Sequence, residues 1–311
     1  MKKEIVDYKV ADVKSFSELL FRMEQGWGFE AAQLANAYRV ILEMVEDKEC
    51  IKFLSLTANL VSTGIRGVIA EMIRKGLCNV IITTGGTFDH DIARSISKYY
   101  RGEFFMDDRE LKKKEVHRLG NVLIPQKSYG LIIESFTMQM LREITREKKS
   151  FSSRELAEEV GKRLNDENSI LRSAYENRVP VFTPGIVDSA FGTQLFIYSQ
   201  TNEFSLNLLK DMKELSDIVF SSNKTGAIIL GGGISKHHTI WWNQFKGGLD
   251  YVVSFTTAYE FDGSLSGARL EEAITWNKVK ENASIALVHS DVTLVLPLIL
   301  AAIYEKIAVA Y

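Results

Sequence analysis

GAIILGGG, residues 226–233, is a short apolar run that ends in three glycines. Similar apolar runs, each followed by small or polar residues, recur at 51–57, 78–84, 179–184, 250–257 and 284–290. Helix-compatible segments, such as residues 64–75, separate these runs. Continuous apolar strands that alternate with helices are typical of a parallel sheet covered on both faces. The sequence therefore predicts an α/β fold built on a doubly wound, mostly parallel sheet.

Helical patterns occupy the first fifty residues, around Phe16–Met23 and Ala31–Met44. We therefore expect an N-terminal helical extension over residues 1–50 and a single α/β domain over residues 51–311. The segment 102–127 contains the charged run DDRELKKKEVHR. Charge runs usually face water, so this segment is expected to be a solvated insertion or loop rather than a partner-binding surface.

Composition narrows the functional classes. Of the 311 residues, 46% are hydrophobic and 25% charged, which predicts a sizeable core and little disorder. The net charge of −2 provides no basic surface for nucleic acid. Cys50 and Cys78 are too few for a disulfide framework, lack metal-ligand spacing and fit a reducing cytoplasm. The charged N-terminal segment is not a signal peptide. The apolar run at 291–305 is shorter than the ~20 residues that span a bilayer, so a buried helix is expected there.

Polar and glycine-rich segments follow five of the expected strands, at 57–64, 83–91, 231–238, 256–264 and 289–293. Ligands of doubly wound sheets bind beyond the carboxyl ends of the strands. Backbone N–H groups at such turns suit phosphate, and an acid there suits a ribose hydroxyl. A lone glycine cluster is a structural turn by default. Five such segments at one sheet edge favour a dinucleotide site.

The stretch FDGSLSGARLEEAITWNK, residues 261–278, holds the candidate nucleophile, Lys278. Most lysines lie on the surface and stay protonated. Trp276 and Ile274, two and four residues away, indicate an apolar setting that would lower the lysine pKa and allow nucleophilic attack. Three nearby acids could instead stabilise Lys278 as a cation or hold a cationic substrate: Asp262, Glu271 and Glu272. The spacing alone leaves both interpretations open.

His237 and His238 are adjacent in the run GGGISKHH. Neighbouring residues on a helix or strand point in different directions, so this pair cannot share one metal ion. Such histidines are more often structural than catalytic. The position of His237 after a glycine-rich strand end makes it a candidate base, because a neutral imidazole can take a proton from an amine.

Taken together, these motifs resemble the deoxyhypusine synthase family in its archaeal form. The resemblance runs from about Phe53 to Ile303. It rests on the order of TANLVSTGIR, TTGGTFDHDIAR, PGIVDSAFG, GGGISKHH, FDGSLSGARLEEAITWNK and HSDVTLVLPL along the chain. It implies that residues 51–311 form a single catalytic domain with a Rossmann-like, NAD-binding α/β fold.

The resemblance also implies a reaction. The family uses NAD to oxidise spermidine to an imine and moves the butylamine portion to an enzyme lysine, releasing 1,3-diaminopropane. The group then passes to a lysine of translation initiation factor 5A, where the stored hydride reduces it. By this resemblance, Lys278 forms the covalent imine and His237 is the acid/base. The family is a homotetramer whose N-terminal helix can cover a neighbour's site entrance.

The resemblance assigns the remaining site positions. The expected NAD contacts are Asn59, Ser62, Thr84, Gly86, Asp188, Gly232, Thr257, Ala258 and Asp291. The expected amine contacts are Asp89, His237, Asp262, Gly263, Glu272 and Trp276. The Trp276 indole is expected to lie along the methylene chain and attract an ammonium.

Four positions depart from the eukaryotic pattern. Leu265, Thr193 and His90 stand where eukaryotic members carry acids, and Trp241 stands where they carry asparagine. Losing a carboxylate partner for a buried ammonium costs on the order of 2–5 kcal/mol of binding. The resemblance therefore predicts the lysine chemistry and the NAD turns, and leaves the identity of the amine open.

Two alternatives remain at this point. A homospermidine-synthase-like transferase would use the same NAD and lysine chemistry with a small amine acceptor such as putrescine, or with agmatine as donor. An NAD-binding regulatory subunit without turnover would need neither Lys278 nor His237, so the presence of both argues against it.

Overall fold

The computed structural model describes residues 3–309. Four terminal residues of the predicted extension and domain lie outside the described residues: Met1, Lys2, Ala310 and Tyr311. The chain forms two compact units. The first comprises residues up to Ser55 and from Ile218 onward, and the second comprises Leu56–Asp217. The predicted division into a helical extension and one catalytic domain stays a prediction.

Parallel strands form the centre of the first unit, in the order β11 (Val279–His289), β10 (Leu249–Thr256), β9 (Lys224–Leu230) and β1 (Cys50–Leu56). β10 pairs in parallel with both β9 and β11. β9 buries every residue from Thr225 to Leu230, as expected for a strand covered on both faces. The four strands lie close to their predicted positions.

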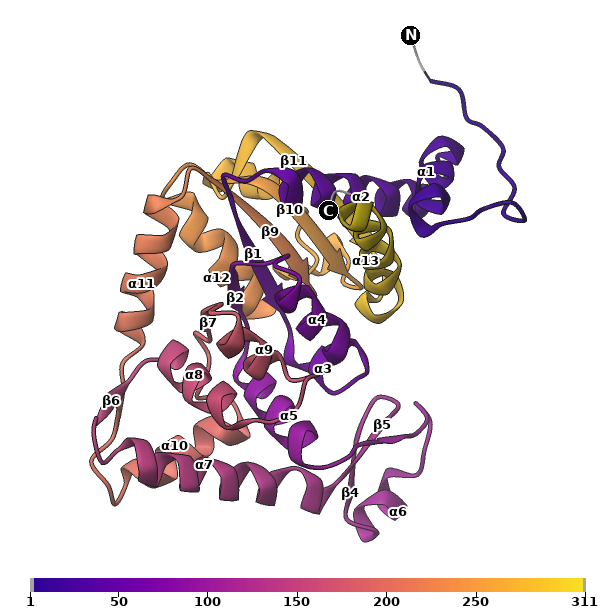
Figure 1. Cartoon of the computed structure of the whole chain (residues 1–311). Coiled ribbons are helices and arrows are strands. Elements are labelled where there is room, and N and C mark those ends of the chain that lie inside the picture. Colours follow the sequence, from indigo (N-terminus) through magenta and orange to yellow (C-terminus); the bar gives the residue numbers. More distant parts are fainter. Residues whose placement is uncertain (1–2, 310–311) are drawn as a thin grey trace. The chain divides into compact units, whose positions relative to one another are not determined.

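Helices surround these strands (Figure 1). α2 (Phe29–Glu46) packs against β10 and β11, and α12 (Gly233–Gln244) packs against β9, β10 and β11. α1 (Phe16–Gly26) and α13 (Val292–Val309) pack against each other and against α2. α1 and α2 confirm the two helices predicted in the first fifty residues. α13 confirms the buried helix predicted for the apolar run, and no helix within residues 3–309 is long and apolar enough to cross a membrane.

In the second unit, β2 (Val80–Ile82) pairs in parallel with β7 (Val181–Phe182). Helices make up most of this unit: α3 (Ala58–Val61), α4 (Ile65–Arg74), α5 (Gly85–Ile96), α7 (Gly130–Ile144), α8 (Ser153–Arg163), α9 (Ile170–Glu176) and α10 (Ala190–Ser199). α11 (Leu208–Ser221) ends in the first unit. β6 (Ser150–Phe151) and β8 (Ser205–Leu206) form a short parallel pair. Together the two units confirm the predicted α/β class.

The predicted insertion at 102–127 carries its own secondary structure. β4 (Val116–Leu119) and β5 (Val122–Pro125) form a hairpin, β3 (Tyr100–Arg101) adds to β5, and α6 (Asp108–Lys113) packs against β4. A short 3-10 turn, η1 (Gln126–Ser128), ends the segment. Most of its residues are exposed. The segment is therefore solvated as predicted, but it is a small folded hairpin and not a loop.

Candidate active site

Lys278 lies in a tight turn between η3, a 3-10 helix at Leu270–Trp276, and β11. Asn277 ends η3 with a φ of 54°, a left-handed conformation that asparagine tolerates better than most residues. The Lys278 backbone N–H donates to Ala273 O at 2.9 Å, and Lys278 O accepts from Leu249 N–H at 3.1 Å. The turn therefore fixes the backbone of Lys278, and only 9% of this residue is exposed.

Two indole rings contact the Lys278 ammonium. Its Nζ lies over the Trp276 ring at 5.2 Å from the centroid and over the Trp241 ring at 5.6 Å. The sequence indicated an apolar setting for Lys278 from Trp276 and Ile274, and the structure places the Trp276 ring at the lysine nitrogen. Trp241 comes from α12 and lies 37 residues before Lys278 in the sequence. Sequence reasoning noted it only as a departure from a family pattern.

His237, on α12, stacks on Trp241 with ring centroids 5.5 Å apart and planes inclined by 25°. Burial lowers the pKa of His237, and the charge of Lys278 lowers it further. An imidazole with a lowered pKa is neutral near pH 7 and can accept a proton. Its position beside Lys278 therefore suits a base that serves this lysine.

His238 has a different environment. Its Nε2 accepts a hydrogen bond from Trp242 Nε1 at 3.1 Å, and burial lowers its pKa to about 4. The two histidines thus point to different partners. Within the part of the chain that the structure describes, no cluster of three or more His, Cys, Asp or Glu side chains could hold a metal ion.

Lys236 precedes these histidines and is 1% exposed. Its Nζ donates to Ala268 O at 2.9 Å. Burial lowers the pKa of Lys236 to about 8, against the opposing charge of Glu272. Ala268 belongs to the loop that follows η2 (Glu260–Asp262), so Lys236 ties α12 to the stretch 261–278 that ends in Lys278. Sequence reasoning missed it because most lysines are exposed.

Two predicted amine contacts lie at the start of this loop, where Asp262 ends η2 and Gly263 follows it. The Asp262 carboxylate is exposed and accepts from Ser264 N–H at 2.6 Å. Hydrogen bonds from the Ser264 side chain and backbone lower the pKa of Asp262. Gly263 has a φ of 70°, which glycine adopts without strain. Glu272, on η3, is exposed. Glu271 pairs with Arg269, with Oε1 and Nη2 3.3 Å apart. None of these acids forms an ion pair with Lys278.

Four predicted NAD positions of the first unit lie after strand ends. Gly232 follows β9, and a Cβ there would collide with the side chain of Ser266. Thr257 and Ala258 follow β10, where Ala258 N–H donates to Thr256 Oγ1 at 3.1 Å. Asp291 precedes α13 and accepts from Thr293 N–H at 2.8 Å. Beside them, Tyr259 stacks on His289 with centroids 5.8 Å apart.

The predicted NAD positions of the second unit lie at the starts of helices. Asn59 is exposed on α3, and the buried Ser62 hydroxyl donates to Asn59 O at 2.7 Å. Thr84 precedes α5 and forms no side-chain cap with it. Gly86, within its first turn, would place a Cβ 2.9 Å from Ala58 Cβ. Asp188 is exposed just before α10.

Asp89 and His90 are both buried on α5. The Asp89 carboxylate accepts from Ala190 N–H at 2.9 Å, Phe191 N–H at 2.7 Å and Tyr129 Oη at 2.9 Å. It therefore holds the start of α10, while burial raises its pKa. His90 shares a 3.0 Å hydrogen bond with Tyr99, and burial lowers its pKa to about 4. A contact of Asp89 with the amine stays a prediction.

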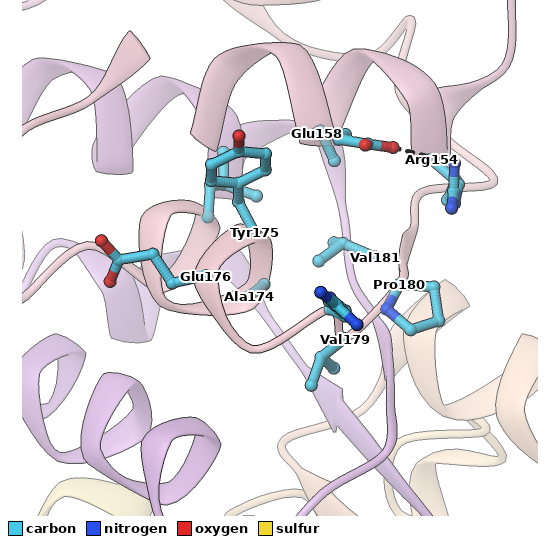
Figure 2. Close-up of a pocket in the computed structure, with 11 residues that line it drawn as sticks. Arg154, Glu158, Ala174, Tyr175, Glu176, Val179, Pro180 and Val181 are labelled. Atoms are coloured by element: carbon cyan, nitrogen blue, oxygen red, sulfur yellow. Dashed lines mark hydrogen bonds and ion pairs between the residues drawn. The ribbon is translucent and has the colours of Figure 1, made fainter. Parts of the chain in front are cut away.

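A separate cavity of about 490 Å³ opens in the second unit near the start of β7 (Figure 2). Arg154, Glu158, Tyr175 and Arg178 line it. Arg154 already pairs with Glu158 at 2.9 Å and with Glu214 at 3.1 Å. The cavity contains none of the predicted site residues, and its charged lining is largely neutralised.

Known proteins match nearly the whole chain. Residues 18–303 match the family model described as deoxyhypusine synthase. A relative from Sulfurisphaera tokodaii is 50% identical over 97% of each chain, and one from Sulfolobus acidocaldarius is 49% identical over 96% of each; both are described as "Probable deoxyhypusine synthase". A solved structure from Entamoeba histolytica, whose description names deoxyhypusine synthase, matches with a TM-score of 0.66, 20% identity and 97% coverage of each chain, and so supports the fold. The match of the family model and the identity to the archaeal relatives show that this chain belongs to the deoxyhypusine synthase family.

Proposed function

We propose that this enzyme transfers the 4-aminobutyl group of spermidine, through an imine on Lys278, to a lysine of translation initiation factor 5A. The observation that supports this reaction most strongly is the arrangement of Lys278 and His237. The lysine is buried between two indoles, and the histidine beside it has a lowered pKa. An amine nucleophile with a neutral base nearby is what imine chemistry requires.

NAD is the cofactor proposed here, and turns at strand ends and helix starts support it. The N-terminus of α5 carries no side-chain cap, and uncapped N–H groups at a helix start attract phosphate oxygens. Gly86 and Gly232 leave no room for a Cβ, so the backbone at these turns approaches its neighbours closely. The residues that would hold the cofactor are Asn59, Ser62, Thr84, Gly86, Asp188, Gly232, Thr257, Ala258 and Asp291. Bound NAD would accept a hydride from the donor amine and return it to the product.

The chain's own residues account for the proton and group transfers. His237 takes the proton released when the donor C–N bond is oxidised. The Lys278 amine attacks the resulting imine carbon, a C–N bond to 1,3-diaminopropane breaks, and the butylamine group stays on Lys278. The acceptor lysine then displaces Lys278 in the same way. The sequence is redox-neutral overall.

The amine is recognised by few carboxylates in this proposal. Trp276, whose ring lies at Lys278 Nζ, would lie along the methylene chain. Asp262 and Glu272 are exposed, and Gly263 gives the loop its turn. His90 is neutral near pH 7 because its pKa is about 4, so it offers no charge to an ammonium. The relatives' descriptions do not favour a small-amine acceptor.

The test is a product analysis with isotopically labelled spermidine and NAD, run with archaeal factor 5A, with putrescine, and with neither. We expect label on one lysine of factor 5A together with free 1,3-diaminopropane. Labelled low-mass product without labelled protein would contradict the proposed acceptor. Replacing spermidine by agmatine in the same assay identifies the donor.

We further propose a homotetramer that works in the cytoplasm. The tetramer rests on the family alone, and light scattering coupled to gel filtration measures it. The cytoplasmic location is supported by the two buried cysteine thiols, Cys50 and Cys78, which are typical of a reducing compartment.

A further inference from the structure

Trp241 contacts both reactive side chains of the candidate site. It lies one helical turn after His237 on α12, and its ring stacks on the imidazole at 5.5 Å. The face of the same indole lies 5.6 Å from Lys278 Nζ. Trp241 is 39% exposed, so part of the ring can still receive an incoming ligand.

Aromatic faces are the groups that the structure places around the Lys278 ammonium. Trp276 adds a second indole at 5.2 Å. Among residues 3–309, no carboxylate lies within ion-pair distance of Lys278 Nζ. An indole face attracts a cation through its quadrupole, and this attraction strengthens when the cation is shielded from water. Lys278 is shielded, with 9% of the residue exposed.

This arrangement differs in its chemistry from a carboxylate pair. A carboxylate would hold the ammonium proton tightly and oppose attack by the lysine. An indole face attracts the ammonium without accepting its proton strongly, so the proton stays available to the neighbouring imidazole. The same face can hold a protonated imine, which keeps a positive charge on the same nitrogen and adds apolar methylenes beside it.

We propose that Trp241 is a positioning and specificity residue: with Trp276 it forms an aromatic cage for the Lys278 nitrogen, and by stacking it keeps His237 beside that nitrogen. The cage selects a donor whose transferred group is a linear alkyl chain, because methylenes and a cationic nitrogen both pack well on an indole. The inference deepens the proposed function and rests on it for the identity of the covalent intermediate.

Trp241→Phe and Trp241→Leu separate the two properties of the side chain. Phenylalanine keeps an aromatic face, and leucine keeps only apolar bulk. Phe220→Leu, which replaces an exposed aromatic side chain on α11 (59% exposed), is the matched control. We expect the rate of borohydride-trapped adduct formation on Lys278, with spermidine and NAD, to fall about tenfold in Trp241→Leu, the size of one shielded cation–π contact. The phenylalanine variant should stay within about threefold of wild type by the same estimate.

A second readout does not depend on turnover. The proton NMR titration of His237 should show a pKa closer to the ordinary value in Trp241→Leu than in wild type, because the imidazole loses its stacked cover. Wild-type trapping that Trp241→Leu leaves unchanged would overturn the inference while the proposed function stands. If wild type forms no trapped adduct at all, the proposed function fails. An unchanged pKa of His237 in Trp241→Leu would separately overturn the positioning role of Trp241.

Discussion

Replacing Lys236 by methionine should change how the stability of the enzyme depends on pH. The Lys236 side chain is 1% exposed, and its Nζ donates to Ala268 O. Methionine has a similar length and no charge, so the variant keeps the packing and removes both the titration and the hydrogen bond. The other ionisable groups are common to both proteins and cancel in the difference.

The magnitude follows from the lowered pKa. Burial moves the pKa of Lys236 from 10.5 to about 8 in the folded chain. Between these values the unfolded chain binds more protons, so the contribution of Lys236 to stability rises with pH. This contribution is fully present above the pKa of the unfolded chain, 10.5, and is lost as the pH falls through the folded pKa of about 8. A shift of this size corresponds to about 3 kcal/mol, and most of it, about 2 kcal/mol, should appear between about pH 7 and about pH 10.

Urea unfolding of both proteins at these two pH values measures the effect. We expect the unfolding free energy of wild type to rise by about 2 kcal/mol relative to Lys236→Met on going to the higher pH. Lys213→Met, which removes a lysine whose side chain is 74% exposed, is the control for a general charge effect. A difference between wild type and Lys236→Met that is the same at both pH values would refute the reasoning.

Three further perturbations have definite outcomes. His90→Asn removes an imidazole whose pKa in the folded chain is about 4. As the pH falls from about 7 to about 4.5, the unfolding free energy of wild type should decrease by about 2 kcal/mol more than that of this variant. Equal decreases in urea unfolding would contradict the burial of a neutral His90. Gly232→Ala places a Cβ against the Ser266 side chain and should weaken NAD binding, measured by calorimetry, by about tenfold or more. Gly130→Ala is the control, because an added Cβ there has no atom within 4 Å, and it should leave the affinity unchanged. Comparable affinities in the two variants would rule out a crowded cofactor turn. Lys278→Arg keeps a cation over the two indoles but cannot form an imine, because arginine stays protonated. This variant should abolish adduct formation with little change in melting temperature. A retained adduct would exclude Lys278 as the nucleophile.

Much of the fold could be predicted because its strands are continuous apolar runs. β9 and β10 were expected at 226–233 and 250–257 and lie at Lys224–Leu230 and Leu249–Thr256. β7 is shorter than the predicted run at 179–184, because Pro180 and Pro184 flank Val181–Phe182 and proline donates no ladder hydrogen bond. The hairpin within 102–127 was missed because its strands are only four residues long and Ile124 is their single buried residue, so no hydrophobic period marks them.

The site was predictable only where contacts are local in sequence. Trp276 lies two residues from Lys278, and the sequence indicated an apolar setting for the lysine from this spacing. Trp241 is remote from Lys278 in the chain, so only the fold shows their contact. The spacing of four between His237 and Trp241 indicates that they share a helix face, and this signal could have identified Trp241 earlier. The buried state of Lys236 has no such signal, because nothing in its neighbours distinguishes it from a surface lysine.

Covalent trapping on the intact enzyme tests the central claim most directly. Wild type is incubated with NAD and spermidine, reduced with borohydride, digested and mapped by mass spectrometry. The account predicts a butylamine adduct on the peptide that contains Lys278, formed only when NAD is present. An adduct confined to another lysine, or the absence of any adduct while NAD is reduced, would contradict it.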